Sequence, residues 1–282
     1  MSLYKFIKSE QDYANVSLLY YKNFENYDAY VCGSGPSLIN NRVFNKAPKT
    51  NIIGVPKSFP TSELDFIVGC PITIEGNFSD NNIFYSNCNM FLPYELSVKL
   101  SNLKPLISDD KFSRVFWYES SQNSEMEHLF HDYKGLHQET NFWNIGSSLE
   151  TALHFTIWMG HKVIYLLGCD FSLEEGDYCN ENFTMTQEER EIQETSFNLR
   201  IEFLRQFSNL CGQNGVEIYS CSTDSPINSF INYISTEDAL EKSWEKAGAS
   251  RPEEGGGQEE VIEHTNSQSF NKDLFNQDLF NL

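Results

Sequence analysis

The stretch that decides the fold is Tyr30-Val31-Cys32-Gly33-Ser34-Gly35-Pro36-Ser37-Leu38, an apolar run that leads into a glycine-rich turn. Glycine permits positive φ values and, because it has no Cβ, lets another group approach closely. Pro36 fits the first turn of a helix, where the missing N–H has no intrahelical partner. The pattern predicts a strand, a turn and a helix N-terminus whose unpaired amides could hold a phosphate. A plain strand–turn–helix junction without a ligand is the alternative interpretation.

Similar short apolar runs recur along the chain from about residue 28 to residue 235. The predicted strands are 29–32, 51–55, 64–70, 115–118, 162–168 and 216–221. Each run is nearly continuous in apolar residues, which is typical of strands that are covered on both faces.

Two helices have recognisable beginnings between these runs. Ser147-Ser148-Leu149-Glu150 fits a capping box, and this helix is expected to end at Gly160. Thr186-Gln187-Glu188-Glu189 fits a second box, and apolar residues then follow on one helix face until Gly212 or Gly215. Strands that alternate with helices through short links imply right-handed crossovers. The predicted fold is therefore α/β, a Rossmann-like and mostly parallel sheet flanked by helices, with a disordered C-terminal tail.

A change of composition after Trp244 divides the chain into a predicted domain, residues 1–245, and a tail, residues 246–282. Residues 248–269 are rich in Gly, Glu, Ser and Gln, a composition that is typical of disorder. Residues 270–282 repeat the pattern Phe-Asn-x-Asp-Leu with a period of five. On a helix this period separates equivalent side chains by about 140°, so it builds no single apolar stripe. The repeat is either a solvated tail or a short docking motif for a protein partner.

The formal net charge of −20 argues against partners that are polyanions, namely nucleic acid and anionic membrane surfaces. No apolar run approaches the roughly 20 residues of a transmembrane helix, and the first ten residues do not resemble a secretory signal. The seven cysteines are scattered without a Cys-x-x-Cys motif, so they are interpreted as small core residues. Together these features predict a cytoplasmic protein without a transmembrane segment.

Ligands of open α/β sheets bind beyond the carboxyl ends of the strands, where the strand order reverses. Three predicted turns qualify: the turn after the first strand, the turn at Asn144–Ser148, and the loop after Gly168. Asp170 in that loop could hold a sugar hydroxyl or a metal, or it could cap a turn. The candidate binding residues on the first two turns are Gly33, Ser34, Gly35, Ser37, Ser147 and Ser148.

Four short segments carry a resemblance to known families: residues 33–38, 147–160, 168–171 and 219–231. They resemble the bacterial sialyltransferases that build lipooligosaccharide. The first three are similar also to the archaeal 6-hydroxymethylpterin diphosphokinases and the motility-associated glycosyltransferases. The resemblance covers about residues 28–235, and it implies a nucleotide-sugar-binding domain and a role in lipopolysaccharide biosynthesis.

The resemblance also implies roles for single residues. Ser34 stands where the sialyltransferases have an asparagine that contacts the donor, and Ser147 and Ser148 match hydroxyls of the nucleotide site. Tyr178 matches one of two tyrosines that stabilise the departing phosphate, whereas Ser172 replaces the other. Cys70-Pro71 replaces an Asn-Pro pair, and the strand and loop at 219–231 would help to bind the nucleotide.

The catalytic base of the sialyltransferases, a histidine before the long helix, has no counterpart in residues 190–194. Glu191 or Glu194 could replace it only with a raised pKa, and a solvated surface is the better interpretation of this acidic segment. His137, shortly before the Asn144 turn, is an alternative base. His128 and His131 are interpreted as part of a surface helix rather than a metal site. His154 and His161 are expected to be structural.

These observations predict a glycosyltransferase that transfers a sugar, expected to be a sialic-acid-like nonulosonic acid, from a CMP-activated donor to a glycan acceptor. Tyr178, Asp170 and His137 would be catalytic, and no metal or cofactor is required. One alternative is a diphosphokinase that uses ATP and Mg²⁺, with Asp170 and Asp177 as metal ligands. The other is a non-catalytic nucleotide-binding module. The sequence identifies neither the sugar nor the acceptor.

Overall fold

A computed structural model gives the fold, and it describes residues 3–7, 12–15, 17, 20–41, 43, 46–58, 64–69, 88–94, 114–119, 147–174, 176–179 and 184–251. Several predictions fall outside these residues: those for Cys70-Pro71, for His128 and His131, for His137, for Asn144, and for the tail from residue 252 onward.

The described residues form one mixed sheet of ten strands with the order β10-β9-β8-β3-β4-β5-β6-β7-β1-β2. From β10 to β7 every neighbouring pair is parallel, whereas β1 pairs antiparallel with β7 and β2. The register places Val31 of β3 between Ile53 of β4 and Leu166 of β8. The strands are β1 (Leu3–Ile7), β2 (Asp12–Asn15), β3 (Asp28–Cys32), β4 (Thr50–Gly54), β5 (Phe66–Val68), β6 (Asn89–Pro93), β7 (Val115–Tyr118), β8 (Val163–Leu167), β9 (Glu217–Ser220) and β10 (Asn232–Tyr233).

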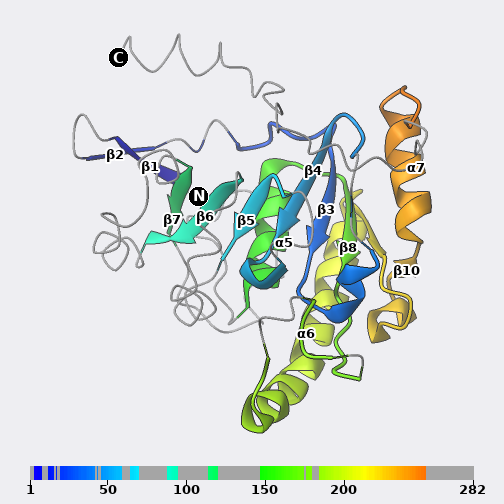
Figure 1. Ribbon diagram of the computed structural model, residues 1–282. Coiled ribbons are helices and arrows are strands. Elements are labelled where there is room, and N and C mark those ends of the chain that lie inside the picture. Colours follow the sequence, from blue (N-terminus) through cyan, green and yellow to red (C-terminus); the bar gives the residue numbers. More distant parts are fainter. Residues whose placement is uncertain are drawn as a thin grey trace, which may run out of the picture. The chain divides into compact units, whose positions relative to one another are not determined.

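Helices cover both faces of the central strands, as Figure 1 shows. One apolar core joins the sheet to α5 (Ser148–Met159) and α6 (Gln187–Gln213), and it contains Phe155 and Phe207. A second core on the opposite face contains residues of η2 (Pro36–Ile39) and α7 (Thr236–Lys246), including Leu38 and Leu240. Two further 3₁₀ turns are η3 (Pro56–Ser58) and η9 (Pro226–Ser229). The predicted α/β fold, a mostly parallel sheet flanked by helices, is confirmed.

The strand order reverses between β3 and β8. From β3 the chain moves across the sheet through β4, β5, β6 and β7, and it then returns to β8 on the other side of β3. The links that leave the carboxyl ends of β3 and β8 therefore diverge to opposite sides of the sheet. Such a switch point opens the crevice in which α/β proteins bind their ligands.

The predicted helix ends are confirmed where a capping residue marks them in the sequence. Ser147 caps α5, and Gly160 ends it in the left-handed conformation with φ +100°. Thr186 caps α6 with a complete capping box to Glu189. Gly212 does not end α6: it lies inside the helix, whose last residue is Gln213. All six predicted strands exist, with bounds that differ by at most a few residues, whereas β1, β2, β6, β10 and α7 were not predicted.

Two further expectations concern the cysteines and the absence of a transmembrane helix. The cysteines within the described residues are buried thiols, as expected for small core residues: Cys32, Cys88, Cys169, Cys179, Cys211 and Cys221. Within the same part of the chain, none of the helices combines the length and the apolar character that a membrane crossing needs.

Candidate functional site

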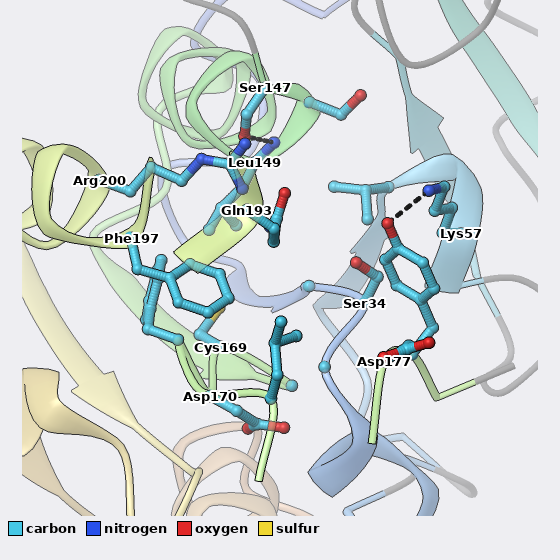
Figure 2. A pocket seen from close by; sticks show the side chains of 18 of the residues that line it. Ser34, Lys57, Ser147, Leu149, Cys169, Asp170, Asp177, Gln193, Phe197 and Arg200 are labelled. Atoms are coloured by element: carbon cyan, nitrogen blue, oxygen red, sulfur yellow. Dashed lines mark hydrogen bonds between the residues drawn. The ribbon is translucent and has the colours of Figure 1, made fainter. Parts of the chain in front are cut away.

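A pocket opens at the switch point, where the chain leaves β3, β4 and β8. Its floor is formed by the Gly33–Gly35 turn after β3 and the Gly168–Leu173 loop after β8. The N-terminus of α5, η3 and one face of α6 form the walls (Figure 2). The sequence predicted that residues 33–37, Asp170 and Tyr178 share a cleft; Gly33, Gly35, Asp170 and Tyr178 do line this pocket.

Three main-chain amides around the first turn are already bonded within the protein. Gly33 N donates to Leu167 O across 2.7 Å, and Gly35 N donates to Gly168 O across 2.9 Å. Ser37 N donates to Asp170 Oδ2 across 2.8 Å. Contrary to the prediction, these three amides are paired, and the predicted helix is only the four-residue 3₁₀ turn η2.

Gly33 and Gly35 are required by the packing of two turns. A Cβ on Gly33 would lie 2.5 Å from Gly168 O, and a Cβ on Gly35 would lie 2.5 Å from Asp170 Oδ2. Gly35 has φ −70°, and the loop after β8 carries positive φ values at Gly168, +60°, and at Phe171, +50°. The glycines thus permit a close approach, but the approaching group is the loop after β8 rather than a ligand.

Asp170 and Ser37 tie these two turns together. The Ser37 hydroxyl donates to Asp170 Oδ1, and it lies 3.1 Å from the Ser222 hydroxyl. Ser37 is outside the pocket lining, so its predicted contact with a ligand is not supported by its position. Asp170 does line the pocket, but its carboxylate accepts two hydrogen bonds from Ser37, which is the turn-capping alternative.

The loop after β9 supports the floor from behind. Ser222 Oγ accepts from Cys169 N across 3.2 Å, and Ser225 Oγ donates to Cys169 O across 2.7 Å. Burial raises the pKa of the Cys169 thiol well above its usual range, so this thiol in the floor is neutral at neutral pH. The resemblance implied nucleotide contacts for residues 219–231, but the structure gives Ser222 and Ser225 a structural role under the pocket.

The N-terminus of α5 forms one wall. Ser147 Oγ accepts from Leu149 N across 3.2 Å, as Figure 2 shows, and Ser148 also lines the pocket. The positive end of this twelve-residue helix therefore faces the pocket. The predicted binding residues Ser147 and Ser148 lie where the sequence placed them.

The opposite wall combines η3 with the end of the loop after β8. Lys57 Nζ donates to Tyr178 Oη across 2.6 Å (Figure 2). Ser34 lines the pocket beside them, and its carbonyl accepts from Cys179 N across 2.9 Å. Ser172 lines the pocket as well, and its hydroxyl accepts from Glu174 N across 3.2 Å. Tyr178, Ser34 and Ser172 were predicted, whereas Lys57 was not.

One face of α6 completes the pocket with three residues that the sequence analysis missed. Gln193, Phe197 and Arg200 follow a spacing of four and three residues, which places them on one side of the helix. Figure 2 shows the Arg200 side chain extending from α6 toward the Ser147 end of α5. The Phe197 ring packs edge-on against Phe171, with 6.0 Å between the centroids. The spacing of Gln193 and Phe197 on the same helix side as the cation Arg200 is the sequence signal that could have identified this face of α6.

The other acids and histidines that the sequence singled out lie outside the pocket lining or are bonded within the protein. Glu191 and Glu194 are exposed and outside the pocket lining, which agrees with their interpretation as solvated surface. Asp177 lines the pocket, but it pairs with Arg190 and accepts from Met185 N across 2.8 Å. His161 is buried at the opposite end of β8, and its role is structural, as expected.

Comparisons with known proteins give a distant likeness of fold. No family model matches the sequence. No curated protein matches it either. Solved structures with a similar fold include the sialyltransferase CstII from Campylobacter jejuni in complex with cytidine-5'-monophosphate, which is 13% identical with a TM-score of 0.42 and covers 74% of this chain and 86% of that chain.

Two further solved structures are similar at the same level. The monofunctional alpha-2,3-sialyltransferase Cst-I from Campylobacter jejuni is 18% identical, with a TM-score of 0.43, and covers 74% of this chain and 80% of its own. The MAf glycosyltransferase from Magnetospirillum magneticum is 15% identical, with a TM-score of 0.41, and covers 79% of this chain and 37% of its own. At these values the likeness concerns the fold alone, and the family resemblance inferred from the sequence stays a prediction.

Proposed function

We propose that this protein is a glycosyltransferase that uses a nucleotide-activated sugar, with a CMP-linked, sialic-acid-like nonulosonic acid as the donor and a glycan as the acceptor. The observation that carries the proposal is the pocket at the switch point between β3 and β8, where α/β proteins bind nucleotides. Among the described residues of its lining, Lys57 and Arg200 supply positive charge in a chain whose formal net charge is −20. Such local cations let an acidic protein bind an anionic substrate.

The walls supply the groups that the transfer requires. Transfer breaks the bond between the anomeric carbon and a phosphate oxygen, and the electron pair remains on the phosphate. Tyr178 and Lys57 would stabilise that developing charge, which is electrostatic catalysis by donors that are already in place. The acceptor hydroxyl forms the new bond and gives its proton to a base. Ser34, Ser147 and the positive end of α5 would hold the rest of the donor.

The diphosphokinase alternative requires carboxylates that are ready to bind Mg²⁺. Asp170 is bonded to the amide and hydroxyl of Ser37, and Asp177 is paired with Arg190. To bind one metal ion jointly, Asp170 would have to give up its bonds to Ser37, and Asp177 its pairing with Arg190. The geometry of this pocket therefore favours a transferase whose charge stabilisation comes from side chains.

Nucleotide binding by the full-length protein is the direct test. Thermal unfolding is measured with CMP, CDP and ATP, each with EDTA and with Mg²⁺. A ligand at 100 times its Kd stabilises the native state by about 2.7 kcal/mol, which raises the Tm of a chain of this size by roughly 5–10 °C. Stabilisation by CMP in EDTA supports the proposal. Stabilisation by ATP only with Mg²⁺ supports the kinase instead, and no shift with any nucleotide contradicts both.

A bulky substitution localises the binding. Ser34→Trp places an indole in the pocket lining and is expected to abolish the CMP-dependent shift while the protein still folds. The matched control is Asp224→Trp, at an exposed position of the loop after β9, which should keep the shift. Release of CMP from a CMP-sugar in the presence of a glycan acceptor, followed by mass spectrometry of the acceptor, then tests the transfer itself.

A further inference from the structure

Arg200 differs from the other two arginines of α6 in its partners. Arg190 pairs with Asp177, and Arg205 pairs with Glu202 across 3.4 Å. Arg200 lines the pocket, and within the part of the chain that the structure describes its guanidinium forms neither an ion pair nor a hydrogen bond. The sequence contains 40 acidic residues against 20 lysines and arginines, so carboxylates are abundant. A guanidinium that faces a pocket instead of a carboxylate has its N–H donors available for an anionic ligand.

The surroundings of Arg200 combine positive charge with an apolar wall. Gln193 and Phe197 lie on the same side of α6, and both line the pocket. The Arg200 side chain extends toward the Ser147 end of α5, as Figure 2 shows, so the positive end of that helix adds to the field of the guanidinium. Glu150, in the first turn of α5, is buried and outside the lining. This part of the pocket therefore suits a small anionic group attached to a larger, partly apolar ligand.

The second cation in the described lining, Lys57, belongs to a different wall. Lys57 is part of η3, where it donates to Tyr178, and Figure 2 shows it on the opposite side of the pocket from Arg200. Two cations on separate elements match a ligand that carries two anionic groups. A nucleotide-activated nonulosonic acid is such a ligand, because its anomeric carbon bears both the phosphate ester and a carboxylate. A neutral sugar on the same nucleotide has only the phosphate.

We propose that Arg200 binds the carboxylate of the donor sugar and thereby makes the pocket selective for acidic sugars. The planar guanidinium matches the two oxygens of a carboxylate with parallel hydrogen bonds, and such charge-assisted bonds are stronger than bonds between neutral groups. This inference rests on the proposed function, because it assumes that a CMP-activated sugar occupies the pocket. Removal of Arg200 should therefore weaken binding of an acidic donor and leave binding of CMP itself unchanged.

The test is isothermal titration calorimetry of the full-length protein with CMP and with two ligands that differ only in the charge of the sugar. These are the 3-fluoro analogue of CMP-N-acetylneuraminic acid, which resists transfer, and its carboxyl methyl ester. The wild type should bind the acid more tightly than the ester by roughly tenfold or more, and Arg200→Met should bring the two affinities within about twofold. Arg205→Met is the matched control, because Arg205 lies on the same helix but outside the lining, and it should keep the preference of the wild type.

The outcomes separate this inference from the proposed function. If Arg200→Met keeps the acid-to-ester ratio of the wild type, or if the wild type itself shows no preference, the inference is overturned while CMP binding still stands. An equal loss of the acid, the ester and CMP also overturns it, because that loss indicates a contact with the nucleotide or a structural role. If the wild type binds none of the three ligands, both proposals fall. Should Arg200→Met fail to fold by circular dichroism, Arg200→Gln replaces it and must abolish the same preference.

Discussion

Acidification should destabilise this protein through His161, a fully buried histidine just after α5. Its Nδ1 lies 2.9 Å from Tyr27 O, and its Nε2 lies 3.3 Å from Asn51 Nδ2. Because the carbonyl can only accept and the amide nitrogen can only donate, these partners fix the neutral tautomer with the proton on Nδ1. A second proton on Nε2 would face the Asn51 donor. The ring also stacks on Phe24, with 5.6 Å between the centroids.

The size of the effect follows from the pKa of His161. Burial lowers this pKa from 6.5 to about 4, the bond to Tyr27 opposes the shift, and the charge of Lys246 adds to it. Below pH 6.5 the unfolded chain therefore binds a proton that the folded protein does not, so the stabilisation is complete above pH 6.5 and decreases toward pH 4. Each pKa unit corresponds to about 1.4 kcal/mol, so a change from pH 6.5 to pH 5 removes about 2 kcal/mol.

Urea unfolding at pH 7 and at pH 5, followed by tryptophan fluorescence, measures this effect in the wild type and in His161→Gln. Other groups also titrate in this range, so the informative quantity is the difference between the two proteins. The wild type should lose about 2 kcal/mol more than the variant between the two pH values. His264→Gln, in the tail whose composition predicts disorder, is the control and should follow the wild type. Equal losses in the wild type and His161→Gln would refute the reasoning.

Two further predictions concern packing and a buried charge. Gly33→Ala should destabilise the protein by roughly 1–3 kcal/mol in urea unfolding, because its Cβ would lie 2.5 Å from Gly168 O. Gly212→Ala, where a Cβ meets nothing within 4 Å inside α6, should instead be neutral or stabilise it by roughly 0.5–1 kcal/mol; equal effects at the two sites would contradict the packing argument. Lys246→Met removes the cation that pairs with Asp28, a carboxylate that is only 3% exposed, and should cost roughly 1–3 kcal/mol. Adding Asp28→Asn should recover part of this loss in the double-mutant cycle, and strictly additive losses would exclude the coupling.

Local patterns in the sequence were sufficient for the secondary structure of the sheet centre. Continuous apolar runs predicted the central strands because a strand covered on both faces has no polar side to display. Ser147 and Thr186 predicted the beginnings of α5 and α6 because a capping side chain bonds to amides only two or three residues away. These signals are contained within a few neighbouring residues. For that reason the α/β class and the location of the pocket at the carboxyl edge of the sheet could be predicted from the sequence.

Contacts between distant segments decided the chemistry of the pocket, and no local pattern contains them. The early glycines suggested an open phosphate cradle, but the last residue of β8 and the loop after it accept from the amides of Gly33 and Gly35. Lys57 was overlooked because it becomes part of a site only where η3 meets Tyr178. Which loops meet depends on the strand order β9-β8-β3-β4, and that order is set by the packing of the whole sheet. Sequence neighbours thus determined the elements, and the tertiary fold alone determined which side chains face one another.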